Sequence, residues 1–227
     1  MAQPQSQSSR VTVIDYGAGN LLSVTNALRQ LGADPRIAES PDAIADSDHL
    51  ILPGVGAFGD CMAELDRRGF AGPIRDWIAA DRPFLGICLG YQLLFEGSDE
   101  SPGVPGLGIF PGRVVRFDSS TLKIPHMGWN SAVPVHPGHP VWAGLGPDPY
   151  FYFVHSYFPA PADPALVATR TDYGAPFASS IQRGRLLATQ FHPEKSQTAG
   201  LRLLANFLHS QAPPPGDMAE RIPPRAH

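Results

Sequence analysis

Short apolar segments in the first half of this chain each end in a sharp turn that leads into a helical pattern. Residues 11–15 are apolar up to a final aspartate, a glycine turn spans 16–20, and residues 21–31 carry apolar side chains at helical spacing. The same order recurs after the apolar segments 49–52 and 83–87. Strands that alternate with helices in this way predict an α/β fold with a mostly parallel central sheet flanked by helices.

The remaining elements are predicted from the same two periodicities. Ser40 is expected to cap a short helix with Pro41 at its first position. Longer helical patterns cover residues 57–68, 73–80, 89–96 and 194–210. The second half changes character, with short strand-like segments between turns at 112–117, 128–135, 150–156, 166–171, 177–182 and 186–190. We expect these segments to add an antiparallel section to the parallel core.

Composition excludes several classes of protein. The chain has 227 residues, 43% of them hydrophobic and 17% charged, which fits one globular domain with a substantial core. A net charge of -4 without a Lys/Arg block argues against nucleic-acid binding. No apolar segment approaches the roughly 20 residues that cross a bilayer, and the polar start is no secretory signal. Two cysteines are too few for a disulfide scaffold, so we expect free thiols and a cytoplasmic location.

The ends of the chain differ from its centre. Residues 1–10 form a polar tail, and residues 211–227 are rich in proline. Such a composition buries too little apolar surface to order itself, so we expect the second tail to be flexible. No internal repeat or linker interrupts residues 11–210, which we interpret as a single domain.

The sharpest local pattern is Gly86-Ile87-Cys88-Leu89-Gly90, which lies between an apolar strand and a helix. This is the glycine-x-nucleophile-x-glycine form of a nucleophile elbow. Cys88 would stand at a helix amino terminus, where the backbone dipole favours a thiolate and free N–H groups bind anions. A cysteine in an apolar segment is about as often a buried small hydrophobe, so this pattern leaves both interpretations open.

A base for such a thiol stands near the other end of the domain. His192 and Glu194 follow a strand, and positions two apart on an extended backbone point to the same side. Pro193 favours extended geometry at His192. The carboxylate would orient the imidazole, which would activate the thiol. Taken alone, the pair is more often a surface histidine beside a helix-capping glutamate.

A third turn, Gly54-Val55-Gly56, also follows a strand. Its glycines let backbone N–H groups approach a ligand, and one such group would help to stabilise an oxyanion. By itself it reads as an ordinary strand-to-helix turn. Ligands bind at the carboxyl ends of strands in α/β sheets, so the three features would converge there. The eight histidines are scattered, and no Cys/His spacing indicates a metal or another cofactor.

These motifs together resemble a known family. The segments LGICLGYQLL around Cys88 and QFHPEKS around His192 are similar to the two signatures of the class I glutamine amidotransferases. The resemblance spans residues 11–208 and implies a flavodoxin-like fold with an added antiparallel section. Further segments resemble, in order, the glutaminase subunits of imidazole glycerol phosphate synthases: DYGAGN (15–20), LPGVGAFGDCM (52–62), PHMGWN (125–130) and YFVHSYF (152–158).

The resemblance implies a mechanism and a set of roles. Cys88 would attack the side-chain amide of glutamine, His192 oriented by Glu194 would move protons, and water would resolve a glutamyl thioester. Backbone N–H groups of Leu89 and of the Gly54–Gly56 loop would hold the oxyanion, and that loop would reorient before catalysis. Glutamine would be bound at Gly54, Gln92, His155, Ser156 and Tyr157.

The resemblance also implies a partner. Ammonia would pass to a cyclase subunit, a (β/α)8 barrel on a separate chain that makes imidazole glycerol phosphate and AICAR in histidine biosynthesis. The residues expected to face this partner are Asn20, Met127, Trp129, Tyr152 and Lys195. Tryptophan and methionine are enriched at interface cores, although each of these side chains could equally pack in the protein's own core.

Three alternatives remain at this stage. Another class I amidotransferase would share the two signatures, but the segments at 52–62 and 125–130 disfavour it. A non-catalytic regulatory binding module would be expected to lose at least one of Cys88, His192 and Glu194. A cysteine hydrolase with a related elbow is disfavoured by Gln92 and by the His-Pro-Glu order.

Overall fold

The computed structural model describes residues 9–118, 120 and 122–209. Its centre is an eight-stranded sheet with the strand order β2-β1-β3-β4-β12-β11-β10-β7. The strands are β1 (Val11–Ile14), β2 (Arg36–Ala38), β3 (His49–Leu52), β4 (Phe84–Ile87), β7 (Val133–Pro134), β10 (Val167–Asp172), β11 (Pro176–Arg183) and β12 (Leu186–Thr189). The five from β2 to β12 are parallel, and the pairs from β12 to β7 are antiparallel. The predicted α/β class is confirmed.

Side chains alternate between the two faces of this sheet, and each face is covered. Val13 and Ile51 pack into one core with α1 (Leu21–Gln30) and α5 (Gln197–His209). Ile14 and Leu52 pack into the other core with α2 (Phe58–Arg67), α3 (Ala71–Ala79) and α4 (Leu89–Gln92). Successive residues of the buried strands therefore have no polar face, which is why these strands read as continuous apolar segments.

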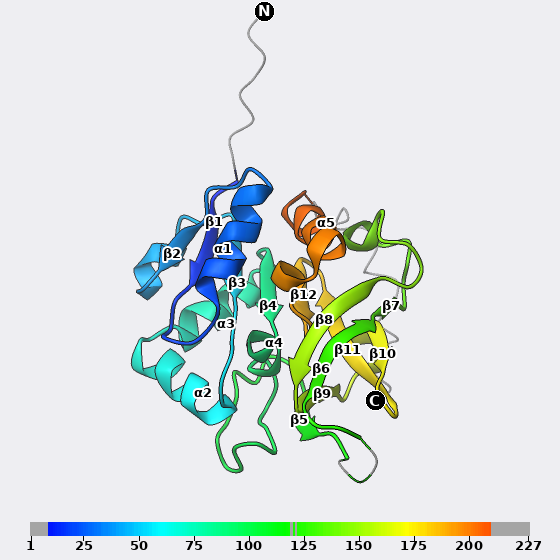
Figure 1. Ribbon diagram of the computed structural model, residues 1–227. Coiled ribbons are helices and arrows are strands. Elements are labelled where there is room, and N and C mark those ends of the chain that lie inside the picture. The colour runs from blue at the N-terminus through cyan, green and yellow to red at the C-terminus, as the bar shows by residue number, and fades with distance from the viewer. Residues whose placement is uncertain (1–8, 119, 121, 210–227) are drawn as a thin grey trace, which may run out of the picture.

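Two antiparallel ribbons complete the second half of the molecule (Figure 1). One pairs β5 (Gly112–Arg116) with β9 (Tyr157–Pro161), and the other pairs β6 (His126–Ser131) with β8 (Tyr150–His155). Phe151 and Phe153 of β8 belong to the same core as α5, so the β6–β8 ribbon lies on that side of the sheet. Short 3-10 turns are η1 (Pro41–Ile44), η2 (Pro140–Trp142), η3 (Pro164–Leu166) and η4 (Pro193–Lys195). The ribbons and the antiparallel strands β7, β10 and β11 of the main sheet together form the predicted antiparallel addition. The segment 186–190, expected in the same section, is β12 and extends the parallel core through its pairing with β4.

Two helix predictions need correction. The helix expected over residues 89–96 ends at Gln92, because the Leu93 and Leu94 carbonyls accept N–H groups from the loop at 107–110 instead of continuing the helix. The helix expected over 194–210 is the turn η4 followed by α5. Gln197 has a φ of 49°, which separates the two.

One strand prediction also needs correction, and two strands were not predicted. The strand expected over 128–135 is two strands, β6 and β7, which pair with different partners. Sequence periodicity missed β2, which has three residues at the sheet edge, and β9, which contains Pro159 and Pro161. Proline removes a ladder N–H, and β9 tolerates two because it pairs with one strand alone.

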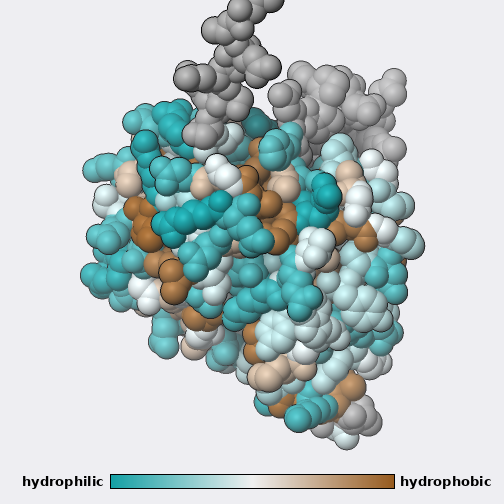
Figure 2. All heavy atoms as spheres, turned by 45° about the horizontal axis from the view of Figure 1, so that its top comes forward, coloured by the Kyte–Doolittle hydropathy of each residue, from teal (hydrophilic) through white to brown (hydrophobic). Residues whose placement is uncertain are grey.

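The predicted tails fall almost wholly outside the described part of the chain, which begins at Ser9 and ends at His209. Within that part, no helix combines the length and apolar character needed to cross a membrane. Hydrophilic residues predominate on the face drawn in Figure 2, and hydrophobic residues form small clusters among them.

Candidate active site

The sharp turn after β4 places Cys88 at the carboxyl end of the sheet. Cys88 has φ 55° and ψ -107°, a backbone conformation that residues with a Cβ rarely adopt. Its N–H donates to the Thr189 carbonyl at 2.7 Å, which ties the turn to β12. The thiol is almost buried, and both Cys88 and Cys61 are free. A strained nucleophile held by the neighbouring strand is the geometry of an elbow.

Residue 90 must be glycine because the elbow lies against the end of β3. A Cβ at this position would overlap the carbonyl oxygen of Leu52, the last residue of β3. The elbow can therefore press against the neighbouring strand only because residue 90 has no side chain.

Gly90→Ala is predicted to destabilise the fold by about 3 kcal/mol or more, because backbone must move to admit the methyl group. Urea unfolding measures the change. Gly72→Ala is the matched control, since a Cβ at Gly72 within α3 meets no atom within 4 Å. That variant should be neutral or slightly stabilised. Equal stability of the two variants would contradict this account of the elbow.

His192 and Glu194 form a buried pair beyond the end of β12. The His192 Nδ1–H donates to Glu194 Oε1 at 2.8 Å, and the two side chains are 2% and 1% exposed. The His192 backbone N–H donates to the Tyr152 carbonyl at 2.9 Å, which fixes the ring's position. Its Nε2 is buried and has no hydrogen-bond partner among the described residues. The pair therefore orients a ring nitrogen that remains free for chemistry.

Opposing effects act on the His192 ring. Burial alone would lower the pKa of His192, but the negative charge of a Cys88 thiolate and then that of Glu194 raise it above its usual value. His192 is thus favoured as the imidazolium, which would form an ion pair with a Cys88 thiolate. That ion pair is the state in which a cysteine is nucleophilic and a histidine can donate a proton to a leaving group.

A cavity of about 370 Å³ joins these groups to most of the predicted substrate residues. It is lined by Val55, Gly56, Cys88, Leu89, Gln92, Glu100, Pro125, Val154, His155, Ser156, Tyr157 and His192. Glu194 does not line it and lies behind His192. Gly54 is also outside the lining, in the tight contact between β3 and the elbow. The three strand-end features therefore converge on one cavity.

The predicted oxyanion donors are not all free. The Leu89 N–H donates to the Gly54 carbonyl at 3.4 Å. A carbonyl oxygen thus occupies the direction from which Leu89 would hold an oxyanion. Because Gly54 O and Val55 N belong to one peptide unit, rotating that unit would turn the carbonyl away and present the Val55 N–H instead.

The sequence analysis missed Gln190, which contacts Cys88 from behind the cavity lining, and Glu100, which lines the cavity. The Gln190 amide nitrogen donates to Cys88 Sγ at 3.7 Å, and its oxygen accepts from Gln92 Nε2 at 3.1 Å. Gln190 stands two positions before His192 on the same strand end, so the alternation that paired His192 with Glu194 would have found it. Glu100 carried no such signal, because it reaches the cavity from a loop and accepts the Phe58 N–H at 2.8 Å.

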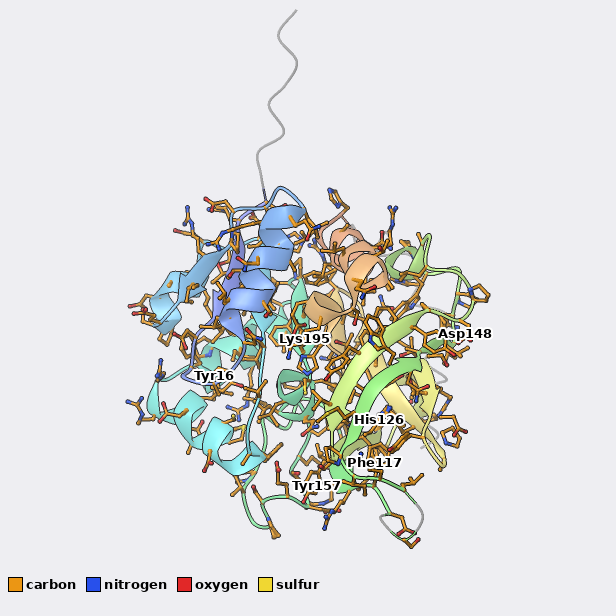
Figure 3. The ribbon with its side chains drawn as sticks, in the orientation of Figure 1. Tyr16, Phe117, His126, Asp148, Tyr157 and Lys195 are labelled. Carbon is orange, nitrogen blue, oxygen red and sulfur yellow. The ribbon has the colours of Figure 1, made fainter. Side chains whose placement is uncertain are left out.

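The residues predicted to face the partner lie in three places, namely the β6–β8 ribbon, the start of α1 and the turn η4. Met127 and Trp129 are 62% and 47% exposed on the outer face of β6, and the Trp129 ring meets Tyr152 of β8 edge-on at 6.3 Å. Lys195 lies near the centre of the molecule, between its parallel and antiparallel halves (Figure 3). The Asn20 side chain accepts the Ser23 N–H at 3.1 Å and caps α1. We call Met127, Trp129 and Tyr152 the ribbon face.

A larger cavity, of about 480 Å³, lies at the opposite, amino-terminal ends of the strands. Ser47, His49, Arg82 and Arg185 are among its lining residues, and none of the predicted catalytic residues reaches it. In the described ranges, no three His, Cys, Asp or Glu side chains gather in a way that would hold a metal ion.

Comparison with known proteins adds sequence relatives. The family model described as "Glutamine amidotransferase class-I" matches residues 12–211. The imidazole glycerol phosphate synthase subunit HisH of Methylococcus capsulatus is 53% identical over 209 residues, which cover 88% of this chain and 96% of that protein. The HisH subunit of Nitrosococcus oceani is 54% identical over 204 residues, with 88% and 97% covered.

Solved structures show the same fold at low identity. The structure of PurLQS from Thermotoga maritima has a TM-score of 0.72 at 19% identity and covers 89% of this chain and 98% of that one. A structure described as a glutamine amidotransferase has a TM-score of 0.69 at 21% identity, with 87% and 97% covered.

Proposed function

This chain belongs to the class I glutamine amidotransferases, among the HisH glutaminase subunits of imidazole glycerol phosphate synthase, and we propose that Cys88, His192 and Glu194 carry its glutaminase reaction. The observation that supports this most is the buried His192–Glu194 pair, whose free Nε2 stands in the same cavity as the elbow thiol. The elbow and the pair come from strands β4 and β12, which are neighbours in the sheet.

The reaction follows from these positions. The Cys88 thiolate attacks the side-chain carbonyl carbon of glutamine, and the His192 imidazolium gives its proton to the departing nitrogen, which leaves as ammonia. Neutral His192 then takes a proton from water as the water attacks the thioester carbon. The products are glutamate and the regenerated thiol. Glu194 keeps the proton on Nδ1, so that Nε2 performs both transfers.

The contact between Leu89 and Gly54 gives the site two states. With the Gly54 carbonyl on the Leu89 N–H, the oxyanion of the tetrahedral intermediate lacks one donor and meets a carbonyl oxygen. Rotation of the Gly54–Val55 peptide supplies two N–H donors instead. We infer that the isolated chain rests mainly in the first state and hydrolyses glutamine slowly.

The partner we propose is the cyclase subunit, a separate (β/α)8-barrel chain that uses the ammonia to make imidazole glycerol phosphate and AICAR. Exposed aromatic and methionine side chains are typical of interface cores, and the ribbon face provides them beside Lys195 and the cavity. Asn20 would lie at the edge of this contact. We place the protein in the cytoplasm, where Cys88 would stay reduced, and propose no nucleic-acid or membrane partner.

Glutamate release from glutamine tests the function. The full chain alone should be slow, and addition of the cyclase subunit with its nucleotide substrate should raise the rate by at least about a hundredfold, as expected if an oxyanion donor is gained. No stimulation by the cyclase would assign the chain to another amidotransferase. Absence of hydrolysis under both conditions would overturn the enzymatic proposal.

Trp129→Ala tests the docking surface. Truncating a central interface aromatic should raise the cyclase concentration needed for half-maximal stimulation by roughly tenfold or more. Ile37→Ala, at an exposed apolar residue on the edge strand β2, is the control and should leave that concentration unchanged. Equal titration curves for the two variants would place the partner elsewhere on the surface.

A further inference from the structure

A continuous line of hydrogen bonds runs from the ribbon β6 to the Cys88 sulfur. The Asn130 Nδ2 donates to His126 Nε2 at 3.3 Å, and His126 Nδ1 lies 3.0 Å from His155 Nε2. His155 Nδ1 donates to the Tyr157 carbonyl at 2.8 Å. The same carbonyl accepts from Gln92 Nε2 at 3.0 Å. From Gln92 the line continues through Gln190 to the thiol.

The direction of every bond in this line is fixed by one end. The Tyr157 carbonyl can only accept, so His155 carries its proton on Nδ1 and its Nε2 is an acceptor. His126 must then donate from Nδ1, which leaves its Nε2 to accept from Asn130. In the neutral state, each of the two rings is therefore the Nδ1–H tautomer.

The surroundings of the two rings favour this neutral state. His126 is stacked between Phe153 and Tyr173, with ring centroids 4.8 and 4.0 Å away, and Phe117 and Phe177 contact both histidines. Both side chains are more than nine-tenths buried. Burial lowers the pKa of His126 to about 4 and that of His155 to about 3, so neither ring is charged at neutral pH. Figure 3 shows His126, Phe117 and Tyr157 in the same part of the molecule.

At the Cys88 end of this line, the hydrogen bonds of Gln92 and Gln190 determine which of their atoms can face glutamine. Both protons of Gln92 Nε2 are used, one on the Tyr157 carbonyl and one on Gln190 Oε1. Gln92 Oε1 is thereby left as the acceptor at the cavity wall, where a donor of the substrate can meet it. The remaining donor of Gln190 points to the Cys88 sulfur.

We propose that His126 and His155 form a tautomer-fixed relay that positions the Tyr157 carbonyl, Gln92 and Gln190 for glutamine binding beside Cys88. His126 does not line the cavity, so it is a positioning residue that acts through His155. The proposal deepens the glutaminase function and rests on it. Its chemical core, the two tautomers, is testable without any activity.

The first test measures the tautomers. In the full chain labelled with ¹⁵N-histidine, NMR at pH 7 should show both rings protonated on Nδ1 alone. His126→Asn and His155→Asn assign the signals by their loss. A ring protonated on Nε2, or on both nitrogens, would overturn the relay, whatever the enzyme activity is.

The second test uses a matched pair of variants assayed with the cyclase subunit. Asparagine and leucine have nearly the same shape, but only His126→Asn keeps an N–H at the place of Nδ1. His126→Leu leaves the buried His155 Nε2 without its donor. We expect the leucine variant to raise the KM for glutamine and to lower kcat/KM by roughly tenfold or more, and the asparagine variant to stay within about threefold of the parent.

Two controls separate the possible failures. Alkylation of Cys88 by iodoacetamide needs no glutamine site and should proceed in both variants, and the buried Cys61 should stay protected if they are folded. Equal kcat/KM for the leucine and asparagine variants would overturn the relay. If the parent chain hydrolyses no glutamine with its cyclase, the proposed function fails, and the NMR measurement still decides the tautomers.

Discussion

Cys88→Ala is expected to abolish glutamate release, with a loss on the order of 10⁴-fold or more in kcat, since no other thiol in the described part of the chain lines the cavity to form the thioester. The variant should still fold, because the thiol makes one weak hydrogen bond, from Gln190 at 3.7 Å, and a methyl group fits the same space. Alanine keeps the Cβ that cysteine already carries at φ 55°, so the substitution adds no strain to the turn. The assay is glutamate release in the presence of the cyclase subunit and its substrate.

The change should separate chemistry from assembly. Cys88→Ala should still bind glutamine and the cyclase subunit, because neither the ribbon face nor Gln92 is altered. It should therefore compete with the parent chain for a limiting amount of cyclase. Retention of more than a few per cent of the glutaminase rate would remove Cys88 from the nucleophile's role and with it the thioester mechanism.

Glu194→Gln is expected to lower kcat by about 10²- to 10⁴-fold. Glu194 is 1% exposed and accepts the His192 Nδ1–H at 2.8 Å. A glutamine amide can donate its N–H₂ to His192 Nδ1, and this bond favours the tautomer that carries its proton on Nε2. A protonated Nε2 can no longer accept a proton from water. The substitution also removes a negative charge that raises the pKa of His192, so the pKa of this ring should fall.

The matched control is Glu39→Gln, an exposed glutamate far along the chain from the site. It makes the same chemical change and should leave kcat within experimental error. Titration of His192 by NMR in the parent and in Glu194→Gln checks the pKa shift independently of turnover. Equal kcat values for Glu194→Gln and the parent would show that another group orients His192.

The amino-acid sequence alone predicts those features of this protein that depend on residues near one another in the chain. The order of strands and helices follows from apolar periodicity, and the buried parallel strands were found because both of their faces are apolar. The elbow is encoded by glycines on either side of Cys88. His192 and Glu194 were expected on the same side because they stand two positions apart on an extended backbone, and the structure gives their contact as 2.8 Å.

Features that arise from contacts between distant segments could be found in the three-dimensional structure alone. Helix α4 stops at Gln92 because carbonyls of residues 93 and 94 find donors at 107–110. Residue 90 must be glycine because the Leu52 carbonyl of β3 occupies the place of a Cβ. The relay joins His126, His155, Gln92 and Gln190 across four segments, and the Leu89–Gly54 bond joins α4 to the loop after β3. Local patterns fix which groups a chain carries, whereas the direction of a buried hydrogen bond depends on which distant partner completes it.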